Sequence, residues 1–101
     1  MYSYEKVLPI GTVVLLKGAQ RRGMIIGYQR TSAGNDEHIY DYCACPYPEG
    51  YMSPEQTFVF DHGQIDRLIS VGFQNLEEID FQEKLREIIN ERENGKGKDA
   101  E

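Results

Sequence analysis

Long apolar runs are missing from this sequence. The longest, VVLL at 13–16 and MII at 24–26, are far shorter than the roughly 20 apolar residues that a membrane-spanning helix needs. The first residues, MYSYEKVLPIG, show no basic stretch followed by an apolar one, so we expect no signal peptide. The sequence therefore predicts a cytoplasmic protein with no membrane contact.

Positive charge is also scarce, because 11 Lys and Arg face 17 Asp and Glu and the net charge is −6. Neutralising phosphates supplies most of the affinity of nucleic-acid binders, so this balance argues against nucleic acid as a partner. The distribution is uneven: Lys17, Arg21, Arg22 and Arg30 form a stretch without acids, whereas 76–101 holds nine acids and five bases. The basic stretch and the acidic segment are either solvated surfaces, or they bind different partners or each other.

Cysteine is rare, and the two residues present, Cys43 and Cys45, stand at i and i+2. On a strand they share one face, and a disulfide between them would close a very small, strained ring. Structural zinc takes four ligands, and His38 lies at an odd offset from both thiols, which puts it on the opposite face of a regular strand. We expect the cysteines to be small buried hydrophobes. A metal protein that uses Cys43, Cys45, His38 or His62 is the alternative.

Signatures of catalysis are missing as well. The glycines match neither a P-loop nor a dinucleotide fingerprint. No spacing links either cysteine to a histidine as a nucleophile and base would require. We therefore expect no enzyme, no catalytic residues, no cofactor and no metal.

The chain itself fits one small domain, since it has 101 residues, of which 40% are hydrophobic. β-rich runs bounded by turn residues predict five strands at 12–17, 23–30, 37–45, 56–60 and 66–73. A capping box from Asp80 to Glu83 predicts a helix over about 81–93, which closes a domain at 1–93, and 94–101 is expected to be a disordered tail. The fold class is α+β, mostly β: a five-stranded, strongly bent antiparallel sheet or SH3-like small barrel with one C-terminal helix.

Two surfaces are candidates for binding a protein. Prolines and a glycine predict a rigid loop that presents Tyr47, Pro48 and Tyr51. The helix carries a narrow apolar stripe of Phe81, Leu85 and Ile88, which docks on its own sheet or on a partner. The alternative for the tyrosines is that they cover one side of a thin core. Helix stripes of this kind also form homodimers.

Five segments carry a resemblance to a known family: LPIGTVVLLKG (8–18), MIIGYQ (24–29), YDYCACPYPEGY (40–51), FVFDHGQID (58–66) and VGF (71–73). In this order they resemble a small uncharacterised-domain family of Gram-positive bacteria. Its members are encoded in type VII (ESX-like) secretion loci, beside LXG-domain toxins and WXG100-like helical proteins. The resemblance covers about residues 8 to 75.

The resemblance implies a cytoplasmic accessory protein, an adaptor or chaperone that helps an LXG toxin reach the export machinery. Its partner would be the LXG toxin or a WXG100-like protein. An immunity protein that binds a cognate toxin is the alternative. The family supplies no catalytic residues to carry over. The position of the family's genes beside those of toxins is an association and gives no physical mechanism.

Overall fold

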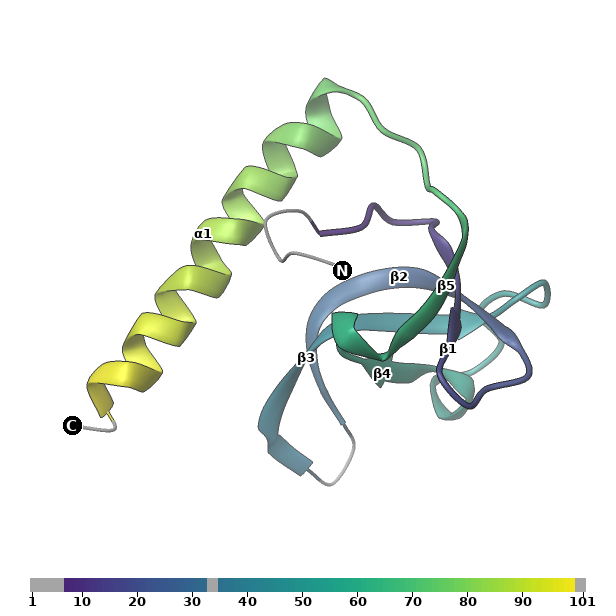
Figure 1. Cartoon of the computed structure of the whole chain (residues 1–101), viewed down its shortest axis with the longest axis horizontal. Helices are drawn as coiled ribbons and strands as arrows, with labels where there is room; N and C mark the ends of the chain where they lie inside the picture. The colour runs from purple at the N-terminus through teal and green to yellow at the C-terminus, as the bar shows by residue number, and fades with distance from the viewer. Residues whose placement is uncertain (1–6, 33–34, 100–101) are drawn as a thin grey trace. The chain divides into compact units, whose positions relative to one another are not determined.

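The computed structural model describes residues 7–32 and 35–99. Two compact units are present: residues 8–73 form one, and the other contains the chain from residue 74 onward. The sheet belongs to the first unit and the helix to the second (Figure 1). The single domain at 1–93 stays a prediction.

The first unit is a five-stranded antiparallel sheet in the order β4-β3-β2-β1-β5. Its strands are β1 (Val13–Leu16), β2 (Arg22–Ser32), β3 (Asn35–Pro46), β4 (Phe58–Phe60) and β5 (Ile65–Ser70). The predicted α+β class, with five antiparallel strands and a C-terminal helix, is confirmed. The sheet is open and not strongly curled, in place of the strong bend or small barrel that the sequence led us to expect. Its edges β4 and β5 do not pair, and closure into a barrel requires that they do.

The core lies on one face of the sheet. Ile25 is opposite Ala44, and Tyr42 is opposite Phe60, so these four side chains share that face. All four are almost fully buried, and the Tyr42 and Phe60 rings stack with centroids 5.2 Å apart. β-Branched and aromatic residues fit such a pleated, buried surface, which is why the runs at 12–17 and 23–30 form strands as predicted.

A buried threonine joins the start of the sheet to its end. The Thr12 hydroxyl accepts a hydrogen bond from the Gly72 backbone N–H at 3.0 Å. Gly72 approaches so closely that an added Cβ would lie 2.1 Å from the Ile10 carbonyl oxygen. Only glycine fits at this position, because the clashing atom belongs to the backbone and cannot turn aside.

Two short 3₁₀ helices connect the last strands, η1 (Pro54–Gln56) and η2 (His62–Gln64). The second connects β4 to β5. The Asp61 backbone N–H donates to Gln64 Oε1 at 2.8 Å, which fixes this turn. It places His62 beneath Tyr42, with ring centroids 5.7 Å apart.

The helix α1 runs from Leu76 to Asp99, so it is longer at both ends than the predicted 81–93. Its first turn is capped by Asn75, whose Oδ1 accepts a hydrogen bond from the Glu78 N–H at 2.9 Å. Asp80, predicted to be the cap, lies inside the helix. Residues 94–99, predicted to belong to a disordered tail, are helical, while 100–101 lie outside the described residues. No described helix is both long and apolar enough to span a membrane.

Candidate functional site

The β1–β2 hairpin and the proline loop after β3 meet at one end of the sheet. Pairing of β2 with β3 places Gly23 opposite Pro46. One step further, the Tyr47 N–H donates to the Arg22 carbonyl at 3.1 Å. This ladder brings the basic turn before β2 beside the tyrosines and prolines that follow β3.

Local contacts hold the proline loop in one shape. The Gly50 N–H donates to the Pro46 carbonyl at 2.8 Å, and Gly50 has φ +82°, which glycine adopts without strain. Glu49 forms an ion pair with Arg21 across the hairpin. The peptide bond between Tyr47 and Pro48 is cis. The loop is therefore ordered while its side chains face solvent, and Tyr51 is 60% exposed.

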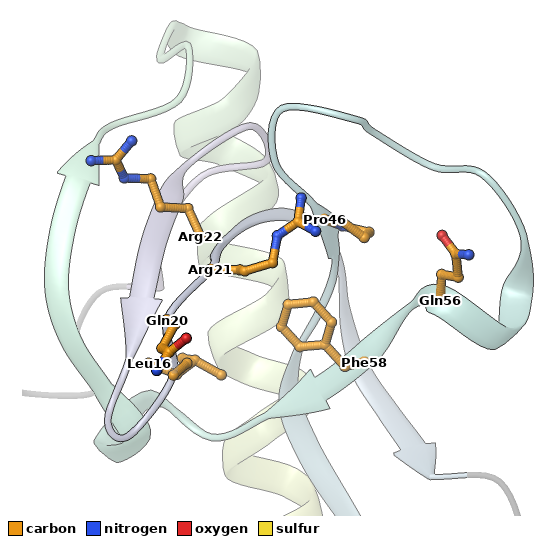
Figure 2. Close-up of a pocket in the computed structure, with 8 residues that line it drawn as sticks. Leu16, Gln20, Arg21, Arg22, Pro46, Gln56 and Phe58 are labelled. Carbon is orange, nitrogen blue, oxygen red and sulfur yellow. The ribbon is translucent and has the colours of Figure 1, made fainter.

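An open cavity of about 390 Å³ lies between the hairpin and the loop (Figure 2). The Phe58 ring and Pro46 form its apolar wall on one side, and Leu16 lies across from them. Its lining residues are Leu16, Ala19, Gln20, Arg21, Arg22, Pro46, Gln56 and Phe58. The cavity is mostly apolar with a few polar side chains in its lining, which is the usual composition of a binding site.

A second cavity, of about 570 Å³, lies on the other side of the two arginines. It is lined by Leu15, Gln20, Arg21, Arg22, Tyr47 and Pro48. Successive strand residues point to opposite faces, and Leu15 lines this cavity while Leu16 lines the first. The two cavities therefore lie on opposite faces of the sheet end, with Arg21 and Arg22 between them. We refer to all the residues that line either of the two cavities, taken together, as the arginine–proline site.

Gly23 makes room for the wall of the first cavity. A Cβ added there would lie 2.5 Å from Phe58 Cζ and 3.6 Å from the Ala44 Cβ. The Phe58 ring therefore occupies the space that a side chain on β2 would fill. Without glycine here, the ring would have to move into the cavity.

The charge of the site is positive. None of the residues that line either cavity is acidic. The nearby Glu49 lies at the surface, and its hydrogen bond with Arg21 lowers the pKa of its carboxyl below the ordinary value. Glu49 therefore stays ionised, and it neutralises one of the two arginines.

The expectation that both cysteines are buried is met by Cys45 and only partly by Cys43. Cys45 is buried and Cys43 partly buried, and both are free thiols. Burial raises the pKa of the Cys43 thiol, while Arg30 acts in the opposite direction. A raised thiol pKa leaves little of the reactive thiolate. Among the residues that the structure describes, no group of three or more His, Cys, Asp and Glu side chains is placed to hold a metal ion.

The two histidines lie apart from the thiols in the hydrogen-bond network. His38 Nε2 is 2.8 Å from Asp61 Oδ2 at the surface. The buried His62 places Nδ1 2.6 Å from the Tyr42 hydroxyl. Burial lowers the pKa of His62, although the Asp41 carboxylate opposes this. His62 is thus a neutral structural residue near pH 7.

The predicted binding residues are divided by the structure. Tyr47 and Pro48 line the second cavity, and Tyr51 is exposed on the same loop. Phe81 and Ile88 lie in the other unit and are half exposed, whereas Leu85 is only 5% exposed and is already covered. Sequence reasoning placed the arginines only in a stretch without acids and missed Phe58, which lies in β4.

One comparison with known proteins gives a result. Residues 7–81 match a family described as a domain of unknown function, DUF4176. The chain belongs to this family. The matched part of this DUF4176 chain contains the whole sheet and ends in the second turn of α1. Neither the curated proteins nor the solved structures include a match. The predicted membership of a small uncharacterised-domain family is confirmed, and the DUF4176 description names no activity, partner or secretion system.

Proposed function

We propose that this chain is a non-enzymatic protein-binding module whose docking surface is the arginine–proline site. The observation that carries the proposal is an ordered loop with exposed Tyr47 and Tyr51 beside two open cavities. Tyrosine offers a large apolar surface and a polar tip with few torsions, so it is common at interface centres. Because the loop is already held by Arg21 and by its own hydrogen bonds, less ordering entropy is lost on binding.

The reactive side chains of the sheet support binding over catalysis. The Cys43 thiol has a raised pKa, and His62 is buried against Tyr42. A nucleophile needs a lowered thiol pKa, and a general base needs access to the proton that it removes. Neither residue meets these requirements.

We further propose that the module is a cytoplasmic accessory of type VII secretion, in the manner of an adaptor or a chaperone. Its partner is an LXG toxin or a WXG100-like helical protein. The support for this setting is the sequence resemblance described above, which is associational. The arginine–proline site supplies a surface on which such a partner can dock.

The test is affinity purification of the tagged chain from its native host, followed by mass spectrometry and by an assay of toxin export. Wild-type protein is expected to recover an LXG toxin or a WXG100-like protein. The double variant Tyr47→Ala and Tyr51→Ala should lose that partner and reduce export. Phe73→Ala is the matched control, since Phe73 is an exposed aromatic that lines neither cavity.

Recovery of the same partner by the double variant would remove the arginine–proline site from the proposal. Protection of a toxin-expressing cell, without any effect on export, would instead assign the role of an immunity protein. Circular dichroism of each variant establishes that the loss of a partner is not a loss of folding.

A further inference from the structure

The arginine–proline site combines an apolar cavity with unneutralised positive charge. The walls of the first cavity include the Phe58 ring, Pro46 and Leu16, and Arg21 and Arg22 also line it. An occupant that fits both parts carries an apolar side chain and, close to it, a negative charge. This combination defines the chemistry of the partner.

Glu49 shows where such a negative charge would bind. Its carboxylate comes from the proline loop and pairs with Arg21 at the surface, where the Arg21 side chain is 66% exposed and that of Glu49 is 36% exposed. Exposed ion pairs contribute little to stability, so another carboxylate can replace this one at small cost. Glu49 is therefore an internal substitute for a carboxylate of the partner.

Arg22 offers a second position for a carboxylate. Its side chain is exposed and extends away from Pro46, whereas Arg21 extends towards it (Figure 2). Among the side chains that the structure describes, no carboxylate pairs with Arg22. The guanidinium group binds carboxylates through two parallel hydrogen bonds, which favours a carboxylate over a diffuse charge.

The shape of the site favours an extended segment. Arg21 and Arg22 separate two cavities on opposite faces of the sheet end, so an occupant of both must pass around that end. Gln20 and Gln56 flank the first cavity, and their amides can bind the free backbone groups of an extended chain. A helix has already used these backbone groups.

We propose that the arginine–proline site binds an extended acidic segment of a partner protein, in which one carboxylate replaces Glu49 at Arg21 and a neighbouring apolar side chain enters the cavity beside Phe58. The inference rests on the proposed function and specifies the partner's chemistry. The Glu49 carboxylate then competes with the carboxylate of the partner for Arg21.

Fluorescence anisotropy with three short labelled peptides tests this. All three peptides carry leucines and a phenylalanine at the same positions and differ in the residues between them. These are aspartate and glutamate in the acidic peptide and asparagine and glutamine in the neutral peptide. In the basic peptide they are lysine and arginine. The acidic peptide is expected to bind about threefold more tightly than the neutral one, the effect of one exposed charge pair. The basic peptide should bind most weakly. Higher salt should weaken the acidic peptide alone, because exposed ion pairs are screened.

Three variants of the full chain locate the effect. Arg21→Gln and Arg22→Gln should each weaken the acidic peptide severalfold and leave the neutral peptide unchanged. Glu49→Gln should strengthen it by a few fold, because the competing carboxylate is gone. Arg30→Gln is the charge-matched control, since Arg30 is exposed and lines neither cavity.

Equal binding of the acidic and neutral peptides would overturn the inference, as would a Glu49→Gln variant with unchanged affinity. Displacement of the acidic peptide by single-stranded DNA at lower concentration than by unlabelled acidic peptide would assign the site to nucleic acid instead. The salt series on the wild-type chain needs no variant and decides the question if a variant fails to fold. If a partner is recovered through Tyr47 and Tyr51 but the peptides show no preference for acid, the proposed function stands and this inference fails.

Discussion

The Tyr42 hydroxyl lies 2.6 Å from Nδ1 of His62, and both side chains are buried. The same hydroxyl accepts a hydrogen bond from the Leu8 N–H at 3.2 Å. The oxygen accepts a hydrogen bond from Leu8, and its own O–H group can donate a hydrogen bond to Nδ1 of His62. The contact joins the middle of β3, the η2 turn and the chain before β1 through one oxygen atom.

Tyr42→Phe is expected to destabilise the protein by about 1–3 kcal/mol. The variant keeps the ring but removes the hydroxyl that bonds to the Leu8 N–H and to Nδ1 of His62. Thermal or urea unfolding measures the change. Tyr40→Phe is the control on the same strand, since the Tyr40 hydroxyl makes no hydrogen bond to the described residues and should change stability little. Equal stability of the two variants would contradict a structural role for the Tyr42 hydroxyl.

Stability is expected to fall as the pH is lowered from about 7 towards 5.5. Burial puts the pKa of His62 in the folded protein below its ordinary value of 6.5, so the unfolded chain binds the proton first. Protonation of the unfolded chain then favours unfolding, by at most about 1.4 kcal/mol for each pH unit between the two pKa values. Urea unfolding at several pH values measures this slope.

His62→Gln should flatten that slope, because the variant removes the group whose pKa burial lowers. A slope that survives in His62→Gln would assign the pH dependence to other groups. The comparison uses slopes, so it holds even if His62→Gln is less stable at every pH.

Gly23→Ala is expected to cost about 1–3 kcal/mol, the usual penalty for adding a methyl group to a packed site. The new Cβ meets Phe58 Cζ at 2.5 Å. Gly27→Ala is the control on the same strand, because its Cβ would make an ordinary contact with the Cys43 Cβ at 3.7 Å. Equilibrium unfolding compares them. A loss in Gly27→Ala as large as in Gly23→Ala would mean that the ring is not the cause.

Leu85→Ala is expected to destabilise the protein by about 2–5 kcal/mol, as for other buried leucines. Ile88→Ala should change stability by less than about 1 kcal/mol, because Ile88 is 44% exposed while Leu85 is 5% exposed. Loss of the helical circular dichroism signal on heating measures both. Similar melting of the two variants would show that Leu85 is not packed in solution.

The strands could be predicted from the sequence because their signals are local. The run 12–17 is β-branched and apolar, and 37–45 alternates between faces. The start of the helix could not be chosen in this way, because Asn75 and Asp80 each precede a glutamate by three residues. Both patterns satisfy the capping rule, and the chain uses the earlier one.

The sequence predicted the loop of the candidate site but not its contact with Arg21. Prolines and a glycine marked the loop that carries Tyr47 and Tyr51, since their effect on the backbone is local. The meeting of that loop with Arg21 depends on Gly23 lying opposite Pro46, a register set by the whole β2–β3 pair. Spacing along one chain carries no direct record of such a pairing.

The open edge of the sheet has a consequence for solubility. Among the strands that the structure describes, β5 pairs with β1 alone, and every β5 residue after Ile65 is exposed. A bare strand edge with apolar side chains such as Leu68 and Ile69 is a template for aggregation at high concentration. Asp66 and Arg67 interrupt that edge with charges of both signs, and so act as gatekeepers. We therefore expect that removing these two charges lowers the concentration at which the protein aggregates.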